Sequence, residues 1–230
     1  MKEQATANNF MSKKTKFKIA GLPKAQGLYN PVNEHDACGV GLVLDIKNRP
    51  SFDIVEKGLA MLCNLEHRGA VGADPKAGDG SGLLIQIPHK FLEKKVSNNF
   101  SIPKPGEYAV GVIFMPNNEN DEKEIKTLIE EVCLKEKIKI LGWRLCPTYT
   151  EELGWSVLPS TPIVYQLFLE KSENEKSQDD FEKKLYILRR CIEKEVLEIS
   201  NQIKDGFYIP SLSSRTILYK GMVLADQVGG

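Results

Sequence analysis

The sequence predicts an α+β domain built in layers. Its 230 residues are 41% hydrophobic, which is enough to bury a sizeable core. Predicted strands come in groups separated by only a few helices, and no repeat of roughly 20 to 50 residues is visible. These observations favour one mixed domain over a repeat protein or a regular βαβ winding.

The first predicted strand covers residues 37–46, an apolar and β-branched run that we expect to be buried. Gly39 and Gly41 remove side chains near its start, so another group is expected to approach the backbone there. A helix follows, with Asp53 at the start of a capping-box spacing and an end near Gly69. One stripe of this helix is expected to comprise Val55, Leu59, Leu62 and Glu66.

Residues 69–82 form a glycine-rich loop that leads into a strand at 83–87. Five glycines and a proline in this segment indicate tight backbone geometry. The remaining elements follow from apolar periodicity. They are strands at 108–115, 138–143, 163–169, 207–212 and 216–219, and helices at 121–137 and 181–200.

Charge and apolar patterning exclude several classes of function. The 31 Lys and Arg residues balance the 31 Asp and Glu residues, so the field that non-specific nucleic-acid binding needs is missing. No apolar run approaches the roughly 18 residues of a membrane span. We expect a soluble protein with neither nucleic acid nor membrane as a partner.

Two common kinds of site are disfavoured by spacing. Residues 78–82 superficially resemble a phosphate loop, but a strand follows them where a helix would be needed. The histidines have no metal-ligand spacing, and a papain-like pair of Cys38 with His89 lacks that family's cysteine signature. The five cysteines fit neither a disulfide framework nor a CxxC site, which indicates a reducing compartment, the cytoplasm; they are Cys38, Cys63, Cys133, Cys146 and Cys191.

Cys38 is the candidate nucleophile because of what precedes it. Residues 1–37 form an arm with six lysines and no arginine. Its composition predicts a disordered tail, and its position before Cys38 predicts a removable propeptide. A cut after Ala37 would put a thiol and a free α-amine on one residue. With an ordinary pKa of about 7.7–8.0, that amine can take the thiol proton at neutral pH. The alternative for Cys38 is a small buried hydrophobe.

Four stretches of the sequence carry a resemblance to a known family. LYNPVNEHDACGVGLVLDI, LEHRGAVGADPKAGDGSGLLIQIP, LGWRLCPT and FYIPSLSSRTILYKGMVLADQ resemble the amino-terminal glutaminase domain of glutamate synthase large subunits. Such domains are type II glutamine amidotransferases, which are N-terminal-nucleophile hydrolases. The resemblance implies a four-layer αββα sandwich, here incomplete at its C-terminus. It also implies a propeptide at 1–37 and the leading part of the glutaminase domain at 38–230.

The resemblance assigns roles to individual residues. Cys38 matches the nucleophile that attacks the side-chain carboxamide of glutamine, which releases ammonia and leaves a thioester for water to hydrolyse to glutamate. Arg68 and Gly69 match the His-Arg-Gly turn beside it, where the arginine helps to hold the active site. Structural roles are expected for Asp79, Gly80 and Arg215.

Two family motifs do not occur in these 230 residues. They are the Asn-Gly pair that stabilises the oxyanion and the Ser-Arg-Phe-Ser-Thr motif whose arginine binds the substrate carboxylate. Losing one oxyanion donor costs about 2.7–4 kcal/mol in a well-studied protease. We therefore expect the chain to be a fragment that is nearly inactive by itself.

The resemblance also implies what the full-length enzyme does. Ammonia would pass to a synthase domain that forms glutamate from 2-oxoglutarate, with FMN, an iron–sulfur cluster and electrons from NADPH or ferredoxin, and with a small reductase subunit as a further partner. No cofactor is expected to bind within this chain itself. Two alternatives stay open: a type II amidotransferase with another ammonia acceptor, and a non-catalytic domain that retains the fold.

Overall fold

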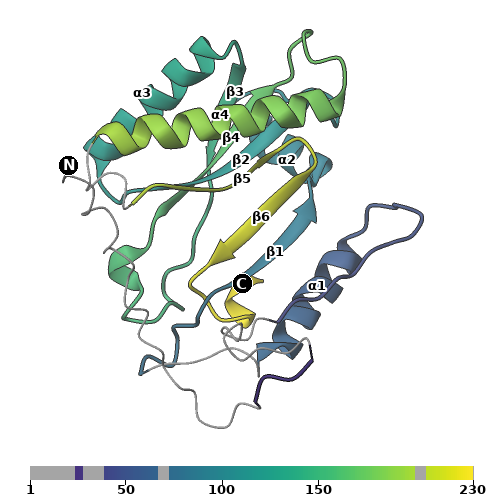
Figure 1. Ribbon diagram of the computed structural model, residues 1–230, viewed down its shortest axis with the longest axis vertical. Coiled ribbons are helices and arrows are strands. Elements are labelled where there is room, and N and C mark those ends of the chain that lie inside the picture. The colour runs from purple at the N-terminus through teal and green to yellow at the C-terminus, as the bar shows by residue number, and fades with distance from the viewer. Residues whose placement is uncertain (1–23, 28–38, 67–72, 200–205, 230) are drawn as a thin grey trace, which may run out of the picture. The chain divides into compact units, whose positions relative to one another are not determined.

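The computed structural model describes residues 24–27, 39–66, 73–199 and 206–229 (Figure 1). The described helices and strands all lie within residues 38–230, which form one compact unit, whereas residues 24–27 belong to a separate unit, 1–37. In chain order the elements are α1 (Phe52–Asn64), β1 (Ser81–Gln86), α2 (His89–Val96), β2 (Tyr108–Met115), α3 (Glu119–Lys135), β3 (Lys139–Leu145), the 3-10 helix η3 (Leu158–Ser160), β4 (Ile163–Glu170), α4 (Gln178–Ile199), β5 (Tyr208–Ser213), β6 (Thr216–Gly221) and the 3-10 helix η4 (Asp226–Val228).

The described strands form two antiparallel sheets. The larger has the order β3-β4-β2-β5, and β2 pairs with β4 along its whole length, from Tyr108 opposite Glu170 to Met115 opposite Ile163. The smaller contains β1 and β6, paired from Ser81 to Gln86. β2 lies inside the larger sheet and all but one of its residues are buried, as its unbroken apolar run predicts.

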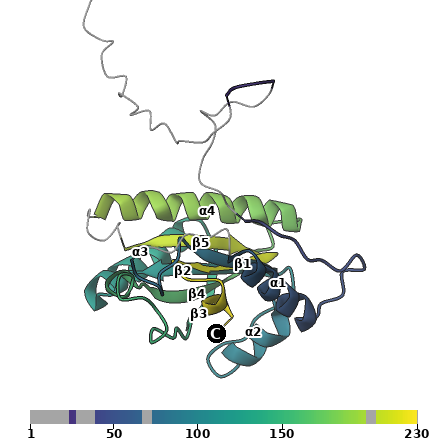
Figure 2. The same ribbon diagram turned by 90° about the horizontal axis from the view of Figure 1, so that it is seen from below.

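Two apolar clusters separate the layers. Odd-numbered residues of β2, such as Ile113, pack with α3 and α4 on one face of the larger sheet, whereas even-numbered residues, such as Val110, pack with α2 and β6 on the other. α1 approaches β1 of the smaller sheet, since a Cβ on Gly58 would lie 3.1 Å from Leu83 Cδ1. Figure 2 shows α4 on one side of the strands and α1 beside β1. This α+β arrangement confirms the predicted layered fold.

Local sequence explains where the long helices begin and which face they bury. Asn118 caps α3 by accepting hydrogen bonds from the backbone N–H groups of Asn120 at 2.9 Å and Asp121 at 3.2 Å. α4 buries one stripe against the larger sheet, as predicted; its buried residues are Phe181, Leu185, Leu188, Ile192 and Val196. Over the described residues, no helix combines the length and apolar character needed to cross a membrane.

The buried stripe of α4 provides a stability test with a matched control on the same helix. Leu185→Ala is expected to destabilise the layer by about 2–5 kcal/mol, because Leu185 is 0% exposed and its loss leaves a cavity. Leu197→Ala, at a position 58% exposed, should change stability by less than about 0.5 kcal/mol. Hydrogen exchange of the α4 amides in the full-length protein measures both effects. Equal effects of the two substitutions would contradict the assignment of Leu185 to the buried face of α4.

Three sequence-based predictions near the start of this unit are wrong. Residues 39–46 form no strand, and most of their apolar side chains are exposed, from 60% for Leu44 to 95% for Ile46, because no described strand pairs with them. Ser51, and not Asp53, caps α1 by accepting from the Asp53 N–H at 3.2 Å. α1 then ends at Asn64, earlier than predicted.

Candidate active site

The three predicted catalytic residues, Cys38, Arg68 and Gly69, lie outside the described residues, but their described neighbours meet. A Cβ on Gly39 would lie 3.2 Å from Leu65 Cβ, and a Cβ on Gly41 would lie 2.7 Å from Met61 Cε. The chain that leaves position 38 therefore runs against the last turns of α1. The close approach predicted at these glycines is confirmed, and the approaching groups are side chains of α1.

The glycine-rich loop packs tightly against β6 and the segment after it. A Cβ on Gly78 would lie 3.0 Å from the Val223 carbonyl oxygen, and one on Gly82 would lie 2.8 Å from the Tyr219 carbonyl oxygen. Gly80 has φ +116°, which L side chains rarely adopt. β1, a strand, follows this loop. The described part of this loop is thus a close-packed turn, in agreement with the structural role expected for Gly80.

A buried carboxylate joins this loop to a distant one. Asp74 is 5% exposed, and its Oδ2 accepts hydrogen bonds from the backbone N–H of Ser156 at 2.7 Å and from the Ser156 hydroxyl at 2.8 Å. Its Oδ1 accepts from the Lys76 N–H at 3.1 Å. Gly154 packs directly on the carboxylate, since a Cβ there would lie 2.7 Å from Asp74 Cγ. Asp74 thus holds the loop at 150–157 against the described part of the glycine-rich loop.

Gln227 joins a third segment, at 222–229, to the two loops that Asp74 connects. Its Oε1 accepts from the Leu224 N–H at 2.8 Å, while its Nε2 donates to the carbonyl oxygens of Glu152 at 2.6 Å and Lys76 at 3.4 Å. η4, which contains Gln227, ends beside α1, because a Cβ on Gly229 would lie 3.2 Å from Leu59 Cδ1. Gln227 therefore holds the segment at 222–229 beside the loop at 150–157 and the described part of the glycine-rich loop.

Asp74 and Gln227 were not identified from the sequence. A signal for Asp74 was present in the Asp-Pro pair within the glycine-rich loop, because such pairs favour turns. Gln227 carried no comparable signal, because its partners lie 75 and 151 residues away along the chain.

The ionisation of Asp74 makes this contact sensitive to acid. Burial opposes the charged form, but the hydrogen bonds from Ser156 and Lys76 outweigh it, so the pKa of the carboxyl lies below its ordinary value of 3.8. A carboxyl whose pKa is lowered by folding stabilises the native state above the unfolded-state pKa, and this contribution is lost as pH falls through the folded-state pKa.

We therefore expect the Asp74–Ser156 contact to persist above pH 3.8 and to weaken only below it. The measurement is hydrogen exchange of the Ser156 amide, corrected for intrinsic rates, from about pH 5 down to about pH 2. Asp74→Asn is the control, because it should remove the acid transition. Loss of protection already above the ordinary carboxyl pKa would contradict the assignment.

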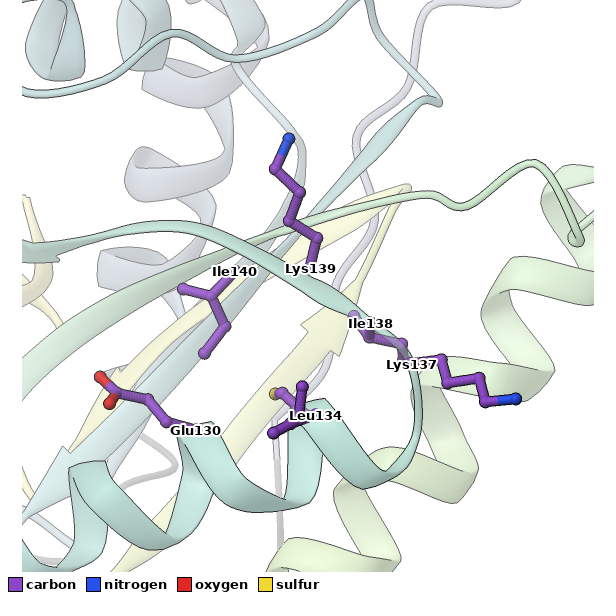
Figure 3. A pocket seen from close by; sticks show the side chains of 7 residues that line it. Glu130, Leu134, Lys137, Ile138, Lys139 and Ile140 are labelled. Atoms are coloured by element: carbon purple, nitrogen blue, oxygen red, sulfur yellow. The ribbon is translucent and has the colours of Figure 1, made fainter.

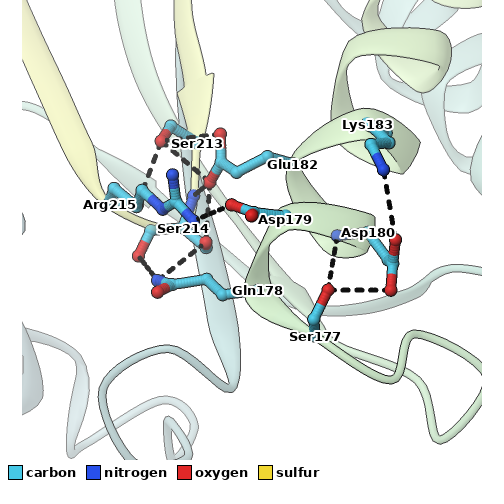
Figure 4. Close-up of polar contacts among 9 residues, drawn as sticks. All are labelled: Ser177, Gln178, Asp179, Asp180, Glu182, Lys183, Ser213, Ser214 and Arg215. Carbon is cyan, nitrogen blue, oxygen red and sulfur yellow. Dashed lines mark hydrogen bonds and ion pairs between the residues drawn. The ribbon is translucent and has the colours of Figure 1, made fainter.

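Arg215 lies in a polar cluster between the β5–β6 turn and the start of α4 (Figure 4). Its guanidinium pairs with Asp179, while Glu182 accepts from the Ser214 N–H and hydroxyl, both at 2.6 Å. Gln178 Nε2 donates to the Ser214 hydroxyl at 3.1 Å. These contacts attach the turn to α4 and support a structural role for Arg215.

Other reactive groups offer no second centre among the described residues. Cys133 is buried and its pKa is raised to about 12 by burial and by Glu130, so its thiol is a poor nucleophile. It lines a mainly apolar pocket of about 390 Å³ between α3 and the first residues of β3 (Figure 3). His89 bonds the Tyr108 hydroxyl at 3.1 Å. Within the part of the chain that the structure describes, no three potential metal ligands gather.

The two antiparallel sheets, with helices packed on the larger one, define the class of protein as a layered α+β domain. A family model described as "Glutamine amidotransferases class-II" matches residues 38–230, and the chain belongs to this family. This finding confirms the resemblance seen in the sequence.

Curated relatives make the comparison more specific. The chain is 42% identical over 209 residues to "Glutamate synthase (NADPH) large chain" of Bacillus subtilis, covering 90% of this chain and 13% of the relative. It is 39% identical to "Ferredoxin-dependent glutamate synthase, chloroplastic" of Oryza sativa, with coverages of 90% and 13%, and 38% identical to "Glutamate synthase (NADH)" of Schizosaccharomyces pombe, with coverages of 90% and 10%. The chain thus spans between a tenth and an eighth of these relatives.

Proposed function

We propose that residues 38–230 are part of a glutaminase domain whose nucleophile is Cys38, freed at its amino group by removal of residues 1–37. The observation that carries the proposal is the family match, which begins at Cys38 itself. The packing of Gly39 on Leu65 supports it, because that contact brings the chain next to Cys38 to the end of α1, three residues before Arg68.

The chemistry would need no histidine. The α-amine of Cys38 takes the thiol proton, and the thiolate attacks the side-chain carboxamide carbon of glutamine. When the tetrahedral intermediate collapses, the C–N bond breaks and the amine returns the proton to the leaving group, which departs as ammonia. Water then attacks the γ-glutamyl thioester, and its hydrolysis gives glutamate and the free thiol. Arg68 and Gly69 would hold the site without taking part in bond changes.

We propose that the whole protein is a cytoplasmic glutamate synthase in which this ammonia aminates 2-oxoglutarate. The names of the relatives support the reaction and allow NADPH, NADH or ferredoxin as the electron donor. FMN and an iron–sulfur cluster would supply the reduction elsewhere in that protein. The described residues of this chain do not fit such a cluster, since they contain no group of three potential ligands.

The test uses the full-length protein and an electrophilic analogue of glutamine that alkylates thiolates. Mass spectrometry of the purified protein is expected to find Cys38 as the first residue. Peptide mapping after labelling should find the analogue on Cys38 and on none of the four other cysteines, which the structure describes as free. Glutamine in excess should protect Cys38 from the label.

Two results would overturn the proposal. One is a mature protein that still begins upstream of Cys38, because the α-amine would then be absent. The other is labelling of a thiol other than that of Cys38. Cys63 is the internal control for this result, because it is free and exposed. Unchanged labelling in the presence of glutamine would show that the analogue reports thiol exposure and no substrate site.

A further inference from the structure

A polar network crosses the apolar layer between the two sheets. Its centre is Gln166 of β4, which is 0% exposed. Strand alternation puts Gln166 on the same face as Phe168, a member of the apolar cluster between the sheets. A buried amide is costly unless both of its ends are hydrogen-bonded, so its partners decide whether the residue can be accommodated there.

Both ends of the Gln166 amide have partners on other strands. Oε1 accepts from Nη1 of Arg144, on β3, at 2.7 Å, and Nε2 donates to the hydroxyl of Tyr219, on β6, at 3.0 Å. A guanidinium can only donate, so the amide has one allowed orientation, and Tyr219 must accept from it. The three side chains therefore connect the larger sheet to the smaller one with defined geometry.

Arg144 differs from the other arginines that the structure describes. Each of those pairs with a carboxylate: Arg49 with Asp45, Arg189 and Arg190 with Glu193, and Arg215 with Asp179. Arg144 has no ion pair among the described residues. It is half-buried, and its Nη1 contacts only neutral acceptors, Gln166 and the Cys146 sulfur at 3.6 Å. A surface ion pair does not explain its position.

The network lies where two of the site loops begin. Arg144 is two residues before Cys146, after which the chain leads to Ser156 and its contact with Asp74. Tyr219 is two residues before the end of β6, after which the chain leads to Gln227. In Figure 1 the arrow of β6 points toward the end of the molecule where η4 lies.

We propose that Arg144, Gln166 and Tyr219 are positioning residues for the glutaminase reaction. They set the end of β3 relative to the end of β6, and so hold the loop at 150–157 and the segment at 222–228 against the glycine-rich loop. This inference rests on the proposed function. Apolar packing is non-directional and allows the sheets to slide, whereas a chain of hydrogen bonds with fixed donors and acceptors does not.

The experiment compares two tyrosines in the full-length protein. Tyr219→Phe removes the acceptor of Gln166. Tyr165→Phe is the matched control, because the Tyr165 hydroxyl also bonds a side chain, Glu122 at 2.8 Å, but on the helix side of the larger sheet. Gln166→Glu is the conservative variant, since a carboxylate can accept from both Arg144 and the Tyr219 hydroxyl. The readouts are kcat and KM for glutamine, and hydrogen exchange of residues 150–157 and 222–228.

Tyr219→Phe is expected to lower kcat by about ten- to a hundredfold with KM changed less than about twofold, and to speed exchange in both loops. Tyr165→Phe should leave kcat and loop exchange near wild type, and Gln166→Glu should retain most of kcat. Equal effects of the two tyrosine variants would overturn the inference. If the wild type did not hydrolyse glutamine, the proposed function would fail, and loop exchange alone would decide whether the network positions these loops.

Discussion

Replacing Cys38 with alanine in the full-length protein is expected to lower glutamine hydrolysis by on the order of 10⁶-fold, the loss seen when a hydrolase loses its nucleophile. Alanine keeps the α-amine and the backbone but offers no atom to form the thioester. Synthesis of glutamate from added ammonia should survive, because ammonia bypasses the glutaminase step. The measurement is the rate of glutamate formation with glutamine or with an ammonium salt as nitrogen donor.

Cys63→Ala is the control for this substitution, because Cys63 is exposed, free and located on α1. It should change neither rate. If Cys38→Ala reduced the glutamine-dependent and ammonia-dependent rates equally, Cys38 would be a structural residue, and the mechanism proposed for this domain would be wrong.

The second large effect is expected at Gly154. A methyl group there would lie 2.7 Å from Cγ and Oδ1 of Asp74, whose carboxylate is fixed by Ser156 and Lys76 and cannot move aside. Gly154→Ala should therefore cost about 1–3 kcal/mol, as overpacking at buried positions does. It should also release the loop at 150–157, which is measured as faster hydrogen exchange and a lower rate of glutamine hydrolysis.

A double-mutant cycle identifies the cause of this effect. If the clash with the carboxylate is responsible, Gly154→Ala should cost little stability in the Asp74→Ala background. The double variant should then resemble Asp74→Ala alone. Additive effects would mean that Gly154 is needed for its backbone conformation, and the assigned contact would then be unimportant.

Local patterns predicted the larger sheet and its helices well. The limits of β2 agree with the predicted 108–115, and α4 starts three residues before the predicted 181, at Gln178. α2 was missed because eight residues with two buried positions, Leu92 and Val96, give too little periodicity beside a proline. Periodicity is reliable where one element buries a long stripe, and it fails where an element is short.

The segment at 39–46 shows the opposite failure. Its β-branched, apolar character predicted a buried strand, yet strand formation requires a partner, and the described residues provide none. Gln166 is a related case. It lies within the strand predicted at 163–169, and nothing local indicates that Arg144 and Tyr219, at sequence distances of 22 and 53, complete its hydrogen bonds.

The sequence alone therefore determined the layered α+β class, the order of the main strands and helices, the family, and Cys38, Arg68 and Gly69 as the residues to test. These follow from patterns contained within a few turns or strands and from continuous motifs. Tertiary structure alone decided that Asp74 joins Ser156, that Gln227 ties three loops together, and that a buried amide connects the sheets. Those contacts join groups far apart in the chain, and only the packing of the two sheets brings them within hydrogen-bonding distance.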